Sequence, residues 1–342
     1  MKHNNVSVFV THIGCPHMCA FCNQRTITGN TEIPHASDVE RICSQALEQI
    51  TDPSESEIAF FGGSFTAVPR DYMLELLLSA NKFIGAGKFK GIRISTRPDY
   101  IDEQVLDILK QYGVTSIELG AQSLCDEVLE ANERGHTEQD VVNASKLIKE
   151  YGFELGLQMM VGLYKSDPQC EMYTAKRIIE LAPKTVRIYP VVVLKGTKLA
   201  ELYDLGQYEM MTFEQVIGLC AQMLKMFNSA GIDVIKLGLH SSELVEQSIV
   251  AGYYHPALSE IVQSRIFLDG IKTNINGKTS LDLVINSRCI SIVTGQKKSN
   301  INALKELGVT CSISTDDSLS RQEIIINGEK VNVFKIIGDP GI

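Results

Sequence analysis

The sequence predicts an α/β protein built on a partial (β/α)6 TIM-like barrel, followed by a small C-terminal α+β module. Over the first 240 residues, short apolar runs alternate with amphipathic helical stretches, which is typical of βαβ units and a parallel sheet. Six or seven such units are too few for an eight-unit barrel but suit a partial one. The pattern changes after about residue 250, so we expect two domains, 1–250 and 251–342.

The strands of the sheet are expected where short apolar runs occur. In chain order these runs are 7–12, 57–61, 91–95, 116–119, 154–161, 185–189 and 234–238. Helical spacing of apolar residues predicts helices at 37–50, 69 to about 85, 102–112, 126–131, 138–151, after 167–168 and at 213–230. Ser37 is a suitable N-cap, Pro69 occupies a tolerated first helical position, and Gly113, Gly152 and Gly231 are typical helix ends.

In the C-terminal module, we expect helices and strands that do not alternate as they do in the first 240 residues. We expect helices at 256–265 and 300–307, and strands at 281–285, 289–293, 311–314, 322–326 and 330–334. Asn327–Gly328 separates the last two runs and is a strong signal for a two-residue hairpin.

Composition excludes several classes of protein. The chain has 342 residues, of which 44% are hydrophobic and 21% charged, a globular balance. No apolar run approaches the ~18 residues of a membrane span, and the beginning lacks the apolar core of a secretory signal. We therefore expect a cytoplasmic protein. The net charge of −9 argues against binding to nucleic acid by bulk charge alone, although a local basic groove would still allow RNA.

Three of the nine cysteines lie within eight residues, directly after the first predicted strand. Their spacing is Cys15-x-x-x-Cys19-x-x-Cys22. Thiolates are soft ligands that select iron–sulfur clusters, Cu(I) or zinc. Three protein ligands leave one coordination position open, which a catalytic metal centre needs for its substrate. The alternatives are a zinc site with a remote fourth ligand, such as His12 or His17, and chance. The other six cysteines are dispersed, so we expect no second cluster.

This spacing after the first strand of a partial barrel resembles the radical S-adenosylmethionine (radical SAM) superfamily. The resemblance implies that Cys15, Cys19 and Cys22 bind three irons of one 4Fe–4S cluster. S-adenosylmethionine would chelate the fourth iron and, on reduction, yield a 5′-deoxyadenosyl radical. An external electron donor is implied as a partner.

The resemblance also implies which residues bind S-adenosylmethionine. They follow successive strands or lie between the cysteines: Phe21, Gly62, Gly63, Ser64, Thr96, Arg97, Gln122, Arg134 and Tyr189. Two adjacent glycines let the backbone approach a ligand closely, and in the family this segment contacts the methionyl amino group. Many members carry Glu where this chain has Ser64.

Roles for the other residues follow in the same way. Arg97 and Arg134 could pair with the methionyl carboxylate or with an anionic substrate, and surface ion pairs are the alternative. Phe21 and Tyr189 would lie near the adenine, with packing as the competing interpretation. No catalytic residue is assigned.

Further stretches resemble the radical SAM half of the Elongator catalytic-subunit family. They are 94–101, 117–123, 134–137, 158–163 and 187–190. That family also has an acetyltransferase domain, but only about 90 residues follow residue 250 here, so we expect no acetyl-CoA chemistry. The resemblance implies RNA as the substrate class, with a uridine in a tRNA anticodon as the candidate.

Two other functions compete with this one. A radical SAM enzyme could instead act on a small molecule, such as a porphyrin-like or cofactor precursor. A non-enzymatic chain could use the cluster as a redox sensor, or zinc to stabilise an RNA-binding module. Cleavage of S-adenosylmethionine and saturable, salt-sensitive tRNA binding would separate these alternatives.

Overall fold

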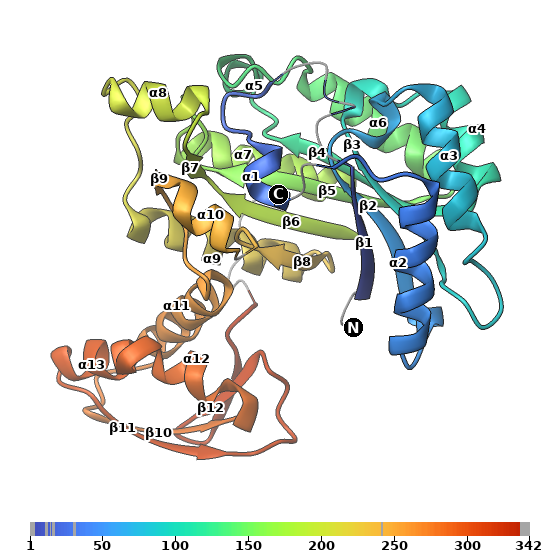
Figure 1. Cartoon of the computed structure of the whole chain (residues 1–342). Coiled ribbons are helices and arrows are strands. Elements are labelled where there is room, and N and C mark those ends of the chain that lie inside the picture. Colours follow the sequence, from blue (N-terminus) through green and yellow to red (C-terminus); the bar gives the residue numbers. More distant parts are fainter. Residues whose placement is uncertain are drawn as a thin grey trace.

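The computed structural model describes residues 4–10, 13, 15, 18–29, 32–240 and 242–335 of the chain. Its main element is a seven-stranded sheet in which every neighbouring pair is parallel, in the order β1-β2-β3-β4-β5-β6-β8. The strands are β1 (Asn4–Val10), β2 (Ser56–Gly62), β3 (Gly91–Thr96), β4 (Val114–Gln122), β5 (Glu154–Val161), β6 (Thr185–Pro190) and β8 (Asp233–Leu237). The sheet curls into the predicted half-barrel, with one strand more than a six-unit version (Figure 1).

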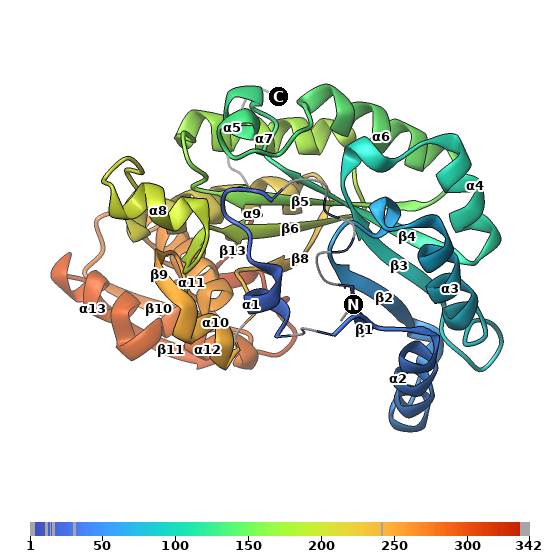
Figure 2. The ribbon, with the colours of Figure 1, turned by 45° about the horizontal axis from the view of Figure 1, so that its top comes forward.

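Helices pack along the outer, convex face of this sheet (Figure 2). They are α2 (Ala36–Gln49), α3 (Arg70–Asn81), α4 (Glu103–Gln111), α6 (Glu138–Glu150), α7 (Pro168–Leu181) and α9 (Phe213–Ser229). Their starts have clear causes: the Asp102 carboxylate accepts a hydrogen bond from the Val105 amide at 2.8 Å, and Asp167 accepts one from the Cys170 amide at 2.8 Å. The N-cap of α2 is His35 and not the expected Ser37, because Asp38 accepts from the His35 amide.

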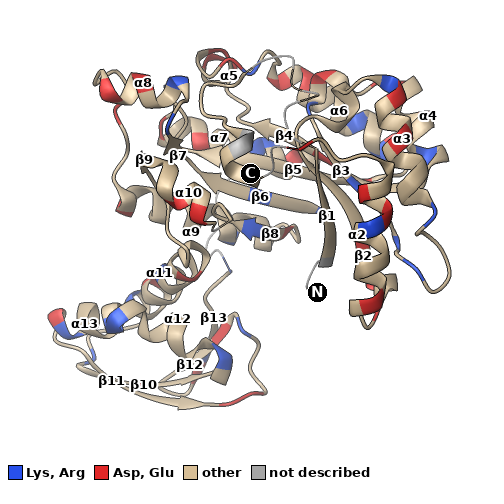
Figure 3. Cartoon of the chain, viewed as in Figure 1, with Lys and Arg blue, Asp and Glu red and all other residues tan. Residues whose placement is uncertain are grey.

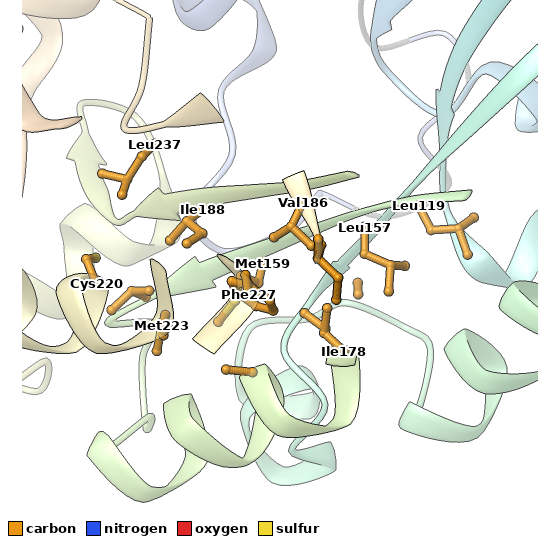
Figure 4. Packing of buried hydrophobic residues seen from close by; sticks show 14 of the residues in the cluster. Leu119, Leu157, Met159, Ile178, Val186, Ile188, Cys220, Met223, Phe227 and Leu237 are labelled. Atoms are coloured by element: carbon orange, nitrogen blue, oxygen red, sulfur yellow. The ribbon is translucent and has the colours of Figure 1, made fainter. Parts of the chain in front are cut away.

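Alternation along each strand divides the sheet into an apolar and a polar face. Convex-face residues are buried under the helices, where Leu157 and Val186 share one cluster with Ile178 on α7 and Phe227 on α9 (Figure 4). Removing such side chains from water stabilises the fold by about 1.5–3 kcal/mol each. The intervening residues point to the concave side, and many of them are polar.

A buried ion-pair cluster lies on the concave side near the amino ends of the strands. The Arg93 guanidinium donates to Glu57 at 2.8 Å and to Glu154 at 3.0 Å, and the Ser116 hydroxyl donates to Glu57 at 2.6 Å. Burial alone would raise the pKa of Glu57, but Arg93 and the hydroxyls of Ser116 and Thr115 lower it below its ordinary value. The cluster thus neutralises charges that the curled sheet takes away from water.

Short elements flank the sheet. They are α1 (Gln24–Thr28), α5 (Asp126–Ala131), α8 (Lys198–Asp204), α10 (Glu243–Ser248) and the antiparallel pair β7 (Val192–Leu194) and β9 (Ile249–Gly252). The sequence did not predict α1, which packs against α10. No helix in the described ranges is long and apolar enough to cross a bilayer.

The C-terminal module is a mixed sheet with helices, joined to the rest by α11 (Leu258–Thr273), which packs on α9. Its sheet has the order β11-β10-β12-β13, from β10 (Ser280–Ile285), β11 (Thr310–Thr315), β12 (Glu323–Ile326) and β13 (Glu329–Asn332). Asn327 and Gly328 have φ values of 50° and 89°, as the predicted hairpin turn requires. The division between the domains at residue 250 stays a prediction.

Two predictions in this module are wrong. The expected strand 289–293 is instead a 3-10 turn (Ser287–Cys289) followed by helix α12 (Ile290–Thr294), since Asn286 caps the turn by accepting from the Arg288 amide at 3.1 Å. A short apolar run does not distinguish a strand from a helix. The helix expected at 256–265 runs on to Thr273. A second helix, α13 (Ser299–Glu306), agrees with expectation.

Candidate functional site

A cavity of about 760 Å³ lies on the concave face, at the carboxyl ends of the strands. Its volume falls within the roughly 300–1,000 Å³ of small-molecule sites. The sequence-predicted site residues all line it: Cys15, Cys19, Phe21, Cys22, Gly62, Gly63, Ser64, Thr96, Arg97, Gln122, Arg134 and Tyr189. The fold therefore brings the nominated residues to one place, while their individual roles stay predictions.

The three cysteines form no disulfide with any described residue, and each is partly exposed. The backbone turns between two of them, where the Cys22 amide donates to the Cys19 carbonyl at 3.0 Å. Among the described residues, no three His, Cys, Asp or Glu side chains are grouped closely enough to hold a metal as they stand. Binding a metal would therefore draw the thiols together. His12 and His17, the alternative ligands, lie outside the described residues.

The donor set nevertheless fits an iron–sulfur cluster with three protein ligands. Cys15, Cys19 and Cys22 are soft donors on one short loop that faces a cavity. That cavity leaves room for a ligand at the open coordination position.

Arg134 connects the cysteine loop to the sheet. Its guanidinium donates to the Cys19 sulfur at 3.0 Å and to the Gly120 carbonyl at 2.6 Å, and only 5% of the residue is exposed. Arg97 makes a bidentate pair with Asp99, at 2.9 Å for each bond, and donates to the Arg134 carbonyl. Both arginines thus have protein partners already, which the sequence did not reveal.

The turn at Gly62 and Gly63 holds the carboxyl ends of β1 and β2 together. Gly62 has φ 111°, and the Gly63 amide donates to the Val10 carbonyl at 2.7 Å. A Cβ atom at Gly62 would lie 3.0 Å from that carbonyl oxygen. Only glycine meets both conditions without strain, so this turn positions the strand that leads into the cysteine loop.

The polar side chains at the ends of β3 and β4 differ in their hydrogen bonding. The Thr96 hydroxyl lies 2.6 Å from the Thr66 hydroxyl, and Thr66 in turn donates to the Tyr100 carbonyl at 2.7 Å. Gln122 has φ 66°, and its buried Oε1 has no hydrogen-bond partner within the described part of the chain. A strained non-glycine residue with an unsatisfied acceptor in a cavity is typical of a ligand-binding position.

A polar row that the sequence analysis did not nominate lines the concave face deeper in the cavity. The Arg187 guanidinium donates to Glu118 at 2.7 Å and lies 5.1 Å above the Phe61 ring. Gln158 and Ser95 also donate to the Glu118 carboxylate.

The pKa values of this row reflect burial and charge. Burial alone would lower the pKa of Arg187, but the adjacent Glu118 carboxylate raises it above its ordinary value. Burial, followed by the charge of Arg187, lowers the pKa of Lys236. Burial raises the pKa of Tyr189. A single charged residue inside an otherwise apolar strand, as in Ile117-Glu118-Leu119, is the sequence signal that could have found this row.

Comparison with known families covers most of the chain. The Radical SAM superfamily model matches residues 9–175, and the Radical SAM C-terminal domain model matches residues 183–267. The second match extends past residue 250, into α11.

Individual relatives point the same way. The tRNA uridine(34) acetyltransferase of Methanocaldococcus jannaschii is 26% identical over 309 residues, covering 78% of this chain and 56% of that protein. An uncharacterized protein of the same organism is 32% identical over 236 residues, covering 62% of this chain and 69% of that protein. Elongator complex protein 3 of Homo sapiens is 31% identical over 192 residues, covering 50% of this chain and 35% of that protein.

The chain spans about half the length of the tRNA uridine(34) acetyltransferases that it matches. Among solved structures, the archaeal Elp3 of Methanocaldococcus infernus, with an N-terminal deletion, has a TM-score of 0.62 at 22% identity, covering 79% of this chain and 63% of that one. That likeness shows the fold alone.

Proposed function

Because this chain belongs to the radical SAM superfamily, we propose that it cleaves S-adenosylmethionine reductively at a 4Fe–4S cluster in order to modify a tRNA base. Its membership makes it an enzyme related to the Elongator-type tRNA-modifying proteins. One observation carries the proposal: the three cysteines and the nominated ligand-binding residues all line a single cavity on the concave face of the half-barrel.

In this proposal Cys15, Cys19 and Cys22 hold the cluster by their thiolates. S-adenosylmethionine bound there supplies, on one-electron reduction, a 5′-deoxyadenosyl radical that abstracts hydrogen from a substrate. Arg134 stabilises the loop in the cluster-binding state, since it donates to the Cys19 sulfur and ties it to β4 through the Gly120 carbonyl.

The remaining residues orient the cofactor. Gly62 and Gly63 let the backbone approach it closely, because neither residue carries a side chain. The unpartnered Oε1 of Gln122 offers an acceptor to a ligand hydroxyl or amino group. Phe21 and Tyr189 offer aromatic surfaces to the adenine.

The tRNA substrate rests on the relatives. Two of the archaeal relatives are tRNA uridine(34) acetyltransferases, and this chain matches about half of their length. We propose a tRNA uridine as the target, in the cytoplasm where tRNA is found. With a net charge of −9, recognition would depend on local shape and stacking and not on bulk charge.

The test is an assay for 5′-deoxyadenosine. The chain is reconstituted anaerobically with iron and sulfide, reduced with dithionite and incubated with S-adenosylmethionine, with and without unfractionated tRNA. The triple variant Cys15→Ala, Cys19→Ala, Cys22→Ala is the control.

We expect 5′-deoxyadenosine from the wild-type chain only, in an amount that rises with tRNA. None above the control would refute radical chemistry and favour a zinc module or a redox sensor. Formation that is indifferent to tRNA would refute the RNA substrate and point to a small molecule.

A further inference from the structure

Two cations face each other across neighbouring strands on the concave face. Arg187 of β6 and Lys236 of β8 are register partners in the parallel ladder, and Gln158 of β5 is the partner of Arg187 on its other side. All three side chains line the cavity. Residues in one register row point to the same side of a sheet, so the two positive charges lie next to each other.

Among the described residues, Glu118 is the one carboxylate that pairs with either cation. Glu118 is 1% exposed, and its oxygens already accept hydrogen bonds from Arg187, Ser95 and Gln158. Within the part of the chain that the structure describes, Lys236 has no hydrogen-bond or ion-pair partner. The described cavity wall carries four Arg and Lys residues, Arg97, Arg134, Arg187 and Lys236, against Glu118 as its one Asp or Glu. Of these four, Arg97 is already paired with Asp99 behind the wall.

Such a cationic wall contrasts with the rest of the chain. The protein as a whole has a net charge of −9, and acidic residues are spread over its helices (Figure 3). Like charges directly across a ladder destabilise a sheet, and partial burial increases their repulsion. A bound anion would relieve both effects.

We propose that Lys236 and Arg187 form a subsite that binds an anionic group of the substrate, a phosphate or a carboxylate. Lys236 supplies a point charge, and Arg187 supplies the guanidinium N–H groups that Glu118 and Tyr189 leave unused. This inference rests on the proposed function, because it takes the cavity to be the substrate site.

Lys236 is distant from most residues expected to bind S-adenosylmethionine, whereas Arg187 borders them, because its guanidinium donates to the Tyr189 hydroxyl at 3.4 Å. Arg97 and Arg134 follow β3 and α5, whereas Lys236 lies on β8, at the opposite end of the sheet from the cysteine loop after β1. A substrate held by its anion on β8 would therefore extend across the cavity toward the cysteines. For an RNA substrate the anion is a backbone phosphate, which positions a nucleotide without specifying its base.

The test compares three probes that differ in charge: uridine, uridine 5′-monophosphate and uridine 5′-carboxylate. Binding to the cluster-loaded wild-type chain is measured anaerobically by calorimetry. The variants are Lys236→Met, which keeps the length but removes the charge, and Lys236→Arg, which restores it. Lys184→Met is the matched control, because Lys184 is exposed and precedes β6, at the amino end of that strand and away from the cavity lining.

We expect at least one charged probe to bind the wild-type chain about tenfold more tightly than uridine, as one charge-assisted contact provides. Preference for the phosphate or the carboxylate identifies the anion. Lys236→Met should abolish the difference, Lys236→Arg should restore it, and Lys184→Met should retain it. Equal binding of all three probes to the wild-type chain would overturn the proposal, as would an undiminished preference in Lys236→Met.

The result of this binding test can be distinguished from the result of the test of the proposed function. Binding is read without reduction of the cluster or cleavage of S-adenosylmethionine, and 5′-deoxyadenosine is assayed on the same wild-type preparation. A charge-dependent affinity without 5′-deoxyadenosine would refute the proposed function alone. The reverse result would refute the anion subsite alone. The iron content and melting temperature of each variant show whether it is folded.

Discussion

Replacing Arg134 by Met should lower the reduction potential of the cluster. The Arg134 guanidinium donates to the Cys19 sulfur at 3.0 Å from a site that is 5% exposed. Met fills a similar volume but carries neither the positive charge nor the donor. Hydrogen bonds and positive charge near the sulfurs favour the more negative, reduced state of an iron–sulfur cluster.

The size of the effect follows from this contact. A hydrogen bond to a charged group contributes about 1.5–3 kcal/mol. If this hydrogen bond stabilises the reduced cluster by that much more than the oxidised cluster, it raises the one-electron reduction potential by about 60–130 mV. We therefore expect a potential that is more negative by about that amount in Arg134→Met.

The assay is a redox titration followed by electron paramagnetic resonance. Arg41→Met is the control, because Arg41 is an exposed residue that pairs with Asp38 on the surface of α2. The iron content of each protein is measured alongside, since losing the bond to Gly120 could also loosen the loop. A potential equal to that of the wild type, at equal iron content, would refute the role assigned to Arg134.

Three other predictions concern stability. Arg93→Met should lower the free energy of unfolding by about 3–5 kcal/mol, because it leaves the buried Glu57 carboxylate uncompensated; urea unfolding measures this, and a loss below 1 kcal/mol would contradict it. Burial raises the pKa of Glu171 to about 7 from an ordinary 4.5. The folded chain therefore keeps a proton that the unfolded chain releases, and this contribution, about 3 kcal/mol, is fully present below pH 4.5 and lost as the pH rises through 7. Glu171→Gln should flatten that part of the pH profile of stability, and an unchanged profile would argue against it. Gly62→Ala should lower both the melting temperature and the iron content after reconstitution, because the new Cβ meets the Val10 carbonyl at a positive φ; wild-type values for both would show that the turn tolerates a side chain.

Much of the fold could be predicted from the sequence because apolar and polar residues alternate regularly along its strands. Convex-face residues such as Ile117 and Leu119 are buried under helices, and this pattern repeats from strand to strand. The cysteine spacing and the Gly62–Gly63 pair likewise carry their chemistry in the local sequence.

Other parts depended on contacts between distant segments. Nothing in the local sequence shows that Arg134 meets Cys19, 115 residues away, or that Lys236 is the register partner of Arg187. The strand expected at 289–293 became a helix because Asn286 caps the preceding turn. Such effects are set by tertiary structure, which a single sequence does not display.

In the proposed reaction, a radical formed in this cavity abstracts hydrogen from a tRNA uridine. The most direct measurement supplies the reduced, reconstituted chain with S-adenosylmethionine and tRNA whose uridines carry deuterium. Mass spectrometry then follows deuterium in 5′-deoxyadenosine and in recovered S-adenosylmethionine. We predict deuterium in one of these products with the wild-type chain and in neither with the triple cysteine variant. Formation of 5′-deoxyadenosine without deuterium in either product would contradict this prediction.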